Sequence, residues 1–262
     1  MQVKLLKIGV QMIKAIIFDL DGTLINTLGG IANACNHVLI KNGFPTNETN
    51  DYCDFVGNGL AMTMFRALPK KMQEEIGASN SHMQNQKDMH GETDFENEKL
   101  KGYISELIAY YAKNPITETF LYDGIPEVLS YLKKSDIPWG IHTNKTYSIA
   151  LDVASAFFSS DEYIGLSGPC DTIKKKPDPQ GSLALLDKAF PDNNGYKLSE
   201  IIYIGDTEVD IETARNLGIK IISVSWGFRK AEHLEVNKPN YLIHEPKEII
   251  TLINRLNDET LT

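Results

Sequence analysis

The sequence predicts an α/β fold with an inserted helical domain, and two observations carry this prediction. Short apolar runs of strand length alternate with amphipathic helical segments along most of the chain, as in a parallel sheet with right-handed crossovers. Residues 28–115 break this alternation and offer only helical segments. We therefore expect a Rossmann-like parallel sheet with helices on both faces, built from residues 1–27 and 116–262, and a helical domain inserted after the first strand.

Four apolar runs are the expected strands, at residues 15–18, 137–142, 201–204 and 219–224. Three amphipathic segments are expected to be helices that cover the sheet, at residues 125–134, 180–190 and 208–217. In the second of these, Leu183, Leu186 and Phe190 recur at helical spacing and predict its buried face. Gly218 directly follows the third and is a typical helix stop.

The inserted region, 28–115, contains apolar stripes at helical spacing. The first stripe consists of Ile31, Ala34, Cys35, Val38 and Leu39, and segments 60–68 and 100–112 supply others. Residues 77–97 are polar with almost no apolar anchors, which predicts a mobile loop or flexible insert. We interpret the two histidines in that insert, His82 and His90, as solvated surface residues rather than metal ligands.

The composition and charge of the chain argue against several classes of function. The chain has 262 residues, 42% hydrophobic and 23% charged, which are ordinary values for a globular protein. A net charge of −9 argues against a nucleic-acid partner, and no apolar run reaches membrane-spanning length, so we expect no membrane partner. The three cysteines lie far apart, which argues against disulfides and a zinc site and favours a reducing cytoplasm. Residues 1–12 do not resemble a signal peptide, and Met12 is a second candidate for the native start.

Polar residues that could take part in catalysis form four clusters. Three clusters follow strands, and the fourth lies in a basic loop. Asp19 and Asp21 end the first strand, Thr143 follows the strand at 137–142, and Asp206 and Asp210 follow the strand at 201–204. The fourth cluster is Lys176-Pro177. Ligands of open α/β sheets bind outside the carboxyl ends of the strands, so these side chains are expected to converge there.

The chain carries four motifs in a fixed order: DxDGT, Thr after a strand, Lys-Pro and GDxxxD. With these motifs in this order, it resembles the phosphatase branch of the haloacid dehalogenase superfamily. Further stretches are similar to its phosphoglycolate phosphatase group, namely Val56-Gly57-Asn58-Gly59-Leu60, Arg66-Ala67-Leu68, Tyr122-Asp123-Gly124, Thr143-Asn144-Lys145 and Trp226-Gly227-Phe228. The resemblance implies that the inserted domain, 28–115, is a cap that selects the substrate. It also implies a small phosphate ester as substrate, with 2-phosphoglycolate as the best single choice.

The residues fit this chemistry on physical grounds as well. Asp19 would attack phosphorus and form an aspartyl-phosphate, while Asp21 would protonate the leaving oxygen and then activate water. Several carboxylates around a phosphate require a hard cation, and oxygen ligands suit Mg²⁺. Asp19 and Asp206 are the expected side-chain ligands, and the resemblance adds the backbone carbonyl of Asp21. Asp210 lies one helical turn after Asp206 and is expected to act behind them or through water.

Substrate contacts are expected from both domains. Thr143 and Asn144 would bind the phosphoryl oxygens, and Lys176 would place a positive charge beside the nucleophile. From the cap, Gly57 and Asn58 would approach the ligand closely, and Arg66 would pair with a substrate carboxylate. Trp226 is interpreted as a packing residue.

The chain departs from the family pattern at two places, and these leave alternatives open. Asn26 stands where the family often carries an acid, and the insert at 77–97 lies in the domain that selects the substrate. A sugar-phosphate phosphatase and a phosphomutase therefore remain alternatives to a phosphoglycolate phosphatase. A dehalogenase is disfavoured because Asp21 serves phosphoryl transfer, and a non-catalytic role is disfavoured because no core motif is degraded. We expect a monomer or a homodimer.

Overall fold

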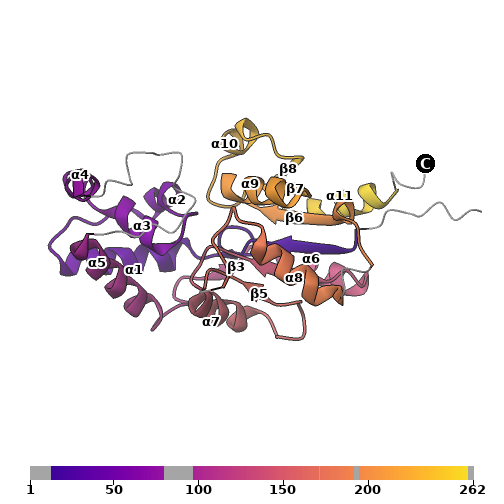
Figure 1. Ribbon diagram of the computed structural model, residues 1–262, viewed down its shortest axis with the longest axis horizontal. Helices are drawn as coiled ribbons and strands as arrows, with labels where there is room; N and C mark the ends of the chain where they lie inside the picture. Colours follow the sequence, from indigo (N-terminus) through magenta and orange to yellow (C-terminus); the bar gives the residue numbers. More distant parts are fainter. Residues whose placement is uncertain (1–12, 80–96, 171, 192–194, 259–262) are drawn as a thin grey trace, which may run out of the picture.

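A computed structural model describes residues 13–79, 97–170, 172–191 and 195–258. Its centre is a six-stranded sheet in the order β5-β4-β1-β6-β7-β8, with all neighbouring strands parallel (Figure 1). The strands are β1 (Ala15–Phe18), β4 (Trp139–His142), β5 (Leu166–Ser167), β6 (Ile201–Gly205), β7 (Lys220–Val224) and β8 (Tyr241–Ile243). The predicted α/β class with a parallel sheet is confirmed.

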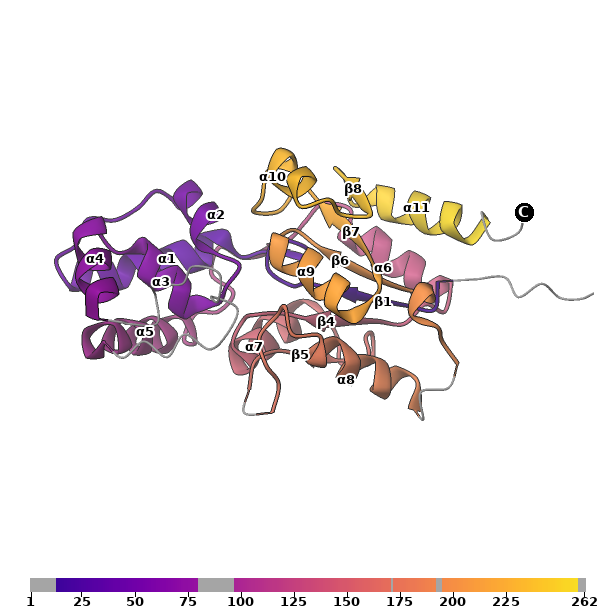
Figure 2. The ribbon, with the colours of Figure 1, turned by 45° about the horizontal axis from the view of Figure 1, so that its top comes forward.

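β1 lies in the middle of the sheet because its side chains are apolar on both faces. All four of its residues are fully buried between β4 and β6. Such a strand needs helices above and below it. One face is covered by α6 (Ile125–Lys134), α7 (Tyr147–Phe157) and α11 (Lys247–Asp258), and the other by α8 (Gln180–Ala189), α9 (Glu208–Leu217) and α10 (Ala231–Val236) (Figure 2).

Five helices of the described residues, all between β1 and α6, form a separate group beside the carboxyl edge of the sheet (Figures 1 and 2). They are α1 (Leu28–Lys41), α2 (Tyr52–Phe55), α3 (Leu60–Ala67), α4 (Lys70–Ser79) and α5 (Glu98–Tyr111). The predicted stripe on α1 is buried, from Ile31 to Leu39. These helices lie within the range 28–115, and the exact cap boundaries stay a prediction.

A short two-stranded ribbon marks the place where the chain enters and leaves this helical group. β2 (Ile25–Asn26) precedes α1 and pairs antiparallel with β3 (Phe120–Leu121), which follows α5. The paired strands hold the two crossings of the chain side by side. We refer to the helical group as the cap and to the sheet with its helices as the core.

Two sequence expectations need correction. The mobile insert was predicted to begin at residue 77, but Gly77 to Ser79 form the last three residues of helix α4. Most of the insert, with His82 and His90, lies outside the described residues. On α8, Leu183 is 40% exposed, and Leu185 with Leu186 forms the buried face instead.

In the part of the chain that the structure describes, no helix combines the length and the apolar character needed to cross a bilayer.

Candidate active site

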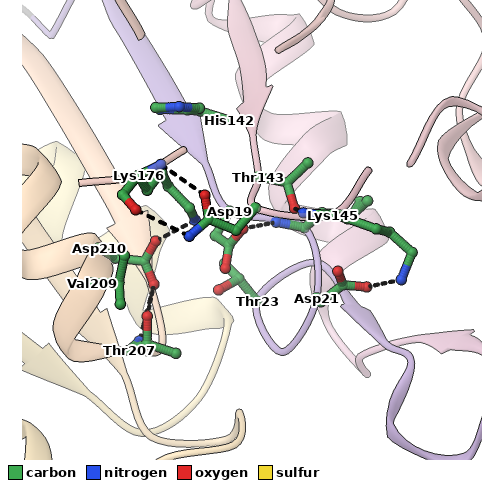
Figure 3. A network of polar contacts seen from close by, with 12 residues as sticks. Asp19, Asp21, Thr23, His142, Thr143, Lys145, Lys176, Thr207, Val209 and Asp210 are labelled. Carbon is green, nitrogen blue, oxygen red and sulfur yellow. Dashed lines mark hydrogen bonds and ion pairs between the residues drawn. The ribbon is translucent and has the colours of Figure 1, made fainter. Parts of the chain in front are cut away.

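Three adjacent strands deliver the predicted motifs to one edge of the sheet. β4, β1 and β6 are neighbours, and they end next to Thr143, Asp19 and Asp206 respectively. Lys176 and Asp210 reach the same place from the loop before α8 and from the first turn of α9 (Figure 3). The core motifs, which are far apart in the sequence, therefore converge as the sequence predicts.

Asp19 and Lys176 form a buried ion pair at the centre of this cluster. The Lys176 Nζ lies 2.8 Å from Asp19 Oδ1, which also accepts the Leu20 N–H at 2.7 Å. Burial raises the pKa of the Asp19 carboxyl to about 7, against the opposing effect of the Lys176 charge. No described residue donates a hydrogen bond to Asp19 Oδ2, so this oxygen is left for a reaction partner.

Asp210 positions Lys176 from the other side. Its Oδ1 lies 2.7 Å from Lys176 Nζ, and its Oδ2 accepts the backbone N–H of Thr207 at 3.0 Å and the Thr207 hydroxyl at 2.6 Å. The bonds to Thr207 form a capping box at the start of α9. Both Asp210 oxygens are thus already engaged, which suits a residue that orients Lys176.

Asp206 is completely buried and is packed against backbone. Its Oδ2 accepts the Phe228 N–H at 2.7 Å, and its Oδ1 lies 3.3 Å from the Thr23 hydroxyl. At Gly22, which has a φ of +87°, an added Cβ would lie 2.3 Å from Asp206 Oδ2, so only glycine fits this turn. Burial, together with the charges of Asp19 and Asp210, raises the pKa of Asp206 well above its ordinary value.

The carboxylates of Asp19, Asp206 and Asp210 fit a divalent cation. One oxygen of each lies within 4.8 Å of the others, and all three side chains are buried. Three acids face a single lysine here, so the cluster carries excess negative charge that a hard cation would neutralise. Asp19 and Asp206 would hold such an ion directly, because Asp19 Oδ2 accepts no hydrogen bond from a described residue and Asp206 has only uncharged donors, whereas Asp210 is ion-paired with Lys176 and bonded to Thr207.

Asp21 stands beside this cluster and has its own partners. Its Oδ1 accepts hydrogen bonds from Lys145 Nζ at 2.9 Å and from the Thr27 hydroxyl at 2.7 Å. No described residue donates to its Oδ2, and the side chain is 16% exposed. One oxygen of Asp21 is therefore fixed, and the other is free to exchange a proton with a substrate.

Thr143 and Asn144 continue the wall of the site after β4. The Thr143 hydroxyl accepts the Lys145 N–H at 3.1 Å. Asn144 Oδ1 accepts the Lys176 N–H at 2.7 Å, and its Nδ2 lies 3.2 Å from the Lys176 carbonyl and 3.3 Å from the Gly57 carbonyl. Asn144 therefore holds the backbone of the loop that carries Lys176, and it also contacts Gly57 of the cap.

A pocket between the core and the cap brings these groups together. Among the described residues it is lined from the core by Asp19, Asp21, Thr143, Asn144, Lys145, Lys176, Thr207 and Phe228, and from the cap by Ile31, Val56, Gly57, Gly59, Leu60 and Thr63. The cap side is mainly apolar, whereas the core side carries the charges. Such a pocket suits a small ligand with one strongly charged end.

The predicted cap contacts are only partly found at this pocket. Gly57 lines it, whereas Asn58 and Arg66 are absent from its lining. The Arg66 Nη1 donates to the Phe55 carbonyl at 2.9 Å, so its guanidinium supports the backbone of α2. Trp226 donates from Nε1 to the Thr23 carbonyl at 3.1 Å and also lies outside the pocket, as expected for a packing residue.

Two residues that shape the site, Lys145 and Arg229, were given no role from the sequence. Lys145 donates hydrogen bonds to Asp21 of the core and to Tyr111 of the cap, and in the sequence it stands out only as part of the stretch Thr143-Asn144-Lys145. Arg229 is the second: it donates to the carbonyls of Cys53 and Val56 in the cap and pairs with Glu208 of the core, Nε to Oε2, at 3.0 Å. A positive residue at either position gives no local sequence signal, because its partners lie far away in the chain.

Comparisons with known proteins identify the family of the chain. The family model of haloacid dehalogenase-like hydrolases matches residues 16–224. A phosphoglycolate phosphatase of Pectobacterium atrosepticum is 25% identical over 241 residues, covering 92% of both chains. One of Rhodospirillum rubrum is 26% identical over 219 residues, covering 84% of this chain and 82% of that protein.

Solved structures share the fold. A protein of Lactobacillus delbrueckii superimposes with a TM-score of 0.77 at 22% identity, over 92% of this chain and 98% of its own. A haloacid dehalogenase-like family protein of Streptococcus pneumoniae gives a TM-score of 0.71 at 25% identity, over 92% of this chain and 98% of its own. The likeness covers nearly the whole chain, including the cap.

Proposed function

Because the chain belongs to the haloacid dehalogenase-like hydrolase family, we propose that it hydrolyses a small phosphate monoester through an aspartyl-phosphate on Asp19, with Mg²⁺ as cofactor. The enzyme is a phosphoric monoester hydrolase, in line with the phosphoglycolate phosphatases that match it along most of its length. The observation that carries the mechanism is the placement of Asp19, Lys176 and Asp21 on one pocket.

In the first step, Asp19 attacks phosphorus, and the bond between phosphorus and the ester oxygen breaks. The free Oδ2 of Asp19 is the oxygen available for this attack, while Lys176 at Oδ1 offsets the charge that approaches it. Asp21 gives its proton to the leaving oxygen from Oδ2, because Lys145 and Thr27 hold its other oxygen. Thr143 and neighbouring backbone N–H groups bind the phosphoryl oxygens.

In the second step, water hydrolyses the aspartyl-phosphate and releases inorganic phosphate. Asp21, now ionised, accepts a proton from that water and returns to its starting state. Mg²⁺, held by Asp19, Asp206 and the backbone carbonyl of Asp21, would supply charge neutralisation for the phosphoryl group. Asp210 contributes indirectly, since it orients Lys176 and completes the acidic cluster.

The substrate that the relatives favour is 2-phosphoglycolate, a phosphate ester with a carboxylate beside the scissile oxygen. The small pocket suits a ligand of this size, and the cap, 28–115, would select it. Three cysteines without a disulfide partner are in line with a reducing cytoplasm, where we place the enzyme.

The test is phosphate release from 2-phosphoglycolate and a panel of sugar phosphates, each with Mg²⁺ and with chelator. We expect metal-dependent release with preference for 2-phosphoglycolate, and preference for a sugar phosphate would move the substrate assignment only. A rearranged sugar phosphate in place of free phosphate would identify a mutase. Phosphate release that persists in chelator would contradict the requirement for Mg²⁺.

The matched variants are Asp19→Asn and, as control, Asp152→Asn, which replaces an exposed acid on α7. We expect Asp19→Asn to lower kcat by at least about a thousandfold, as losses of nucleophiles do, and the control to leave it unchanged. Full activity of Asp19→Asn would exclude the aspartyl-phosphate.

A further inference from the structure

A buried lysine connects the acid/base residue of the core to the cap. The Lys145 Nζ lies 2.9 Å from Asp21 Oδ1 and 3.0 Å from the hydroxyl of Tyr111, the last residue of α5. The Lys145 side chain is 1% exposed, and yet it lines the pocket. The Lys145 ammonium and the Asp21 carboxylate therefore form a buried ion pair at the wall of the pocket.

This contact leaves one donor of Lys145 for a ligand. An ammonium has three N–H donors, and the described partners of Lys145 Nζ use two of them. Tyr111 is buried and does not line the pocket, so its hydroxyl holds the Lys145 ammonium in place from the cap side. The remaining donor of a charged ammonium that lines the pocket suits an oxygen of a carboxylate.

The charges of the pocket point to the same residue. Lys145 and Lys176 are the two cations among the described residues that line it. Lys176 is already shared by Asp19 and Asp210, at 2.8 and 2.7 Å, and serves the phosphoryl group. Lys145 has a single carboxylate partner, Asp21, so it is the cation with capacity for a further anion.

The position of Lys145 fixes which part of a substrate it would meet. Under the proposed mechanism, Asp21 serves the ester oxygen that leaves, and Lys145 is bonded to Asp21. An anionic group recognised by Lys145 must therefore lie within a few bonds of that oxygen. In 2-phosphoglycolate, one methylene separates the ester oxygen from the carboxylate carbon, which satisfies this condition.

We propose that Lys145, held in place by Tyr111, recognises the carboxylate of phosphate esters that carry one next to the scissile oxygen. The inference rests on the proposed phosphatase function and names the residues that determine its substrate. It replaces Arg66, whose guanidinium is bound to the Phe55 carbonyl outside the pocket. Because Tyr111 belongs to the cap and Lys145 to the core, selection requires both domains.

The test compares 2-phosphoglycolate with ethyl phosphate, which lacks the carboxylate and is otherwise closely similar. The quantity measured is the ratio of kcat/KM for the two esters, which cancels effects on Asp21 that both substrates share. We expect Lys145→Met to lower this ratio about 100-fold, as for a lost hydrogen bond to a charged group, and Tyr111→Phe to lower it less, because that variant loses only a contact that positions Lys145. The matched control is Lys113→Met, an exposed lysine near the same end of the cap, with an unchanged ratio.

Several outcomes would overturn the inference. If Lys145→Met lowers kcat/KM for both esters equally, Lys145 acts only by positioning Asp21. If Arg66→Met lowers the ratio and Lys145→Met does not, recognition lies in the cap at Arg66. Equal kcat/KM for both esters in the wild-type enzyme would exclude carboxylate selection while leaving the phosphatase function intact.

A binding measurement separates failure of this inference from failure of the proposed function. Thermal melts are recorded with 2-phosphoglycolate and with ethyl phosphate, and they need no turnover. We expect greater stabilisation of the wild-type protein by 2-phosphoglycolate, and loss of that difference in Lys145→Met. If neither ester is hydrolysed but the difference is present, the phosphatase function fails and carboxylate recognition by Lys145 stands; an absent difference rejects that recognition.

Discussion

The acidic cluster makes a sharp prediction for stability in the absence of metal. Asp19, Asp206 and Asp210 are buried together around one lysine, so their charges oppose folding unless a cation is bound. We predict that Asp206→Asn stabilises the metal-free protein and abolishes its stabilisation by Mg²⁺. Asparagine keeps an oxygen to accept the Phe228 N–H and removes the charge.

The buried acidic cluster sets the sign of the effect and its dependence on pH. Burial raises the pKa of the Asp206 carboxyl well above its ordinary value, and the charges of Asp19 and Asp210 act in the same direction. The folded state binds the Asp206 proton more tightly than the unfolded chain does, so the contribution of this carboxyl to stability is present at low pH and is lost as pH rises above about 4. Since Asp206→Asn removes one uncompensated buried charge, we expect it to gain on the order of 3 kcal/mol at about pH 8 and less at about pH 5.

The assay is denaturant unfolding of wild type and Asp206→Asn at both pH values, in chelator and in millimolar Mg²⁺. Mg²⁺ should stabilise the wild-type protein by mass action and leave Asp206→Asn almost unchanged. Asp152→Asn, on the surface of α7, controls for the general loss of one negative charge. The reasoning is refuted if metal-free Asp206→Asn is less stable than wild type at the higher pH, or if Mg²⁺ stabilises both proteins equally.

Three further predictions concern residues around the site. Lys176→Met should lower kcat by at least about a hundredfold, since the cation beside the nucleophile is lost, and a change in KM alone would contradict its role; steady-state phosphate release measures this. Arg229→Met should destabilise the protein by about 2 kcal/mol in denaturant unfolding, because two cap carbonyls and Glu208 lose a buried donor, and an unchanged midpoint would show that the contact contributes nothing. Burial lowers the pKa of His142 well below its ordinary value, so the contribution of the neutral imidazole to stability is lost as pH falls below about 6.5, and the stability of wild type relative to His142→Gln should fall over that range; parallel pH profiles of the two proteins would contradict this.

The sequence predicted best those elements whose signals are local. The bounds of β1, α6 and α9 agree with the structure, because each combines an apolar pattern with a glycine or acidic boundary nearby. The core site residues were predictable for the same reason: Asp19, Thr143 and Asp206 each directly follow a strand. Parallel strands bring such positions together at one edge without any further information.

The edge strands and the buried face of α8 were not predictable from such local signals. β5 has two residues and β8 has three, too few for a periodic pattern. On α8, Leu183 and Leu185 both fit an apolar stripe, and contact with the sheet decides which is buried. Tertiary contacts therefore override the helical pattern at this position.

Contacts across the domain interface explain why the cap residues were harder to predict than the core residues. Three core side chains reach the cap: Asn144 contacts Gly57, Lys145 contacts Tyr111, and Arg229 contacts Cys53 and Val56. Each joins a residue of the catalytic edge, or a neighbour of it, to a segment more than thirty positions away. Sequence spacing carries no information about such pairs.

These three contacts predict how the cap acts in the reaction. Asn144 is bonded to the backbone of Lys176, Lys145 to the carboxylate of Asp21, and Arg229 to Glu208, which stands two residues before Asp210. Under the proposed mechanism, a shift of the cap relative to the core would therefore act on the groups that hold the phosphoryl oxygens and exchange the proton. Since proton transfer and phosphoryl positioning depend on geometry at the scale of a hydrogen bond, we expect the position of the cap to affect kcat as well as substrate binding.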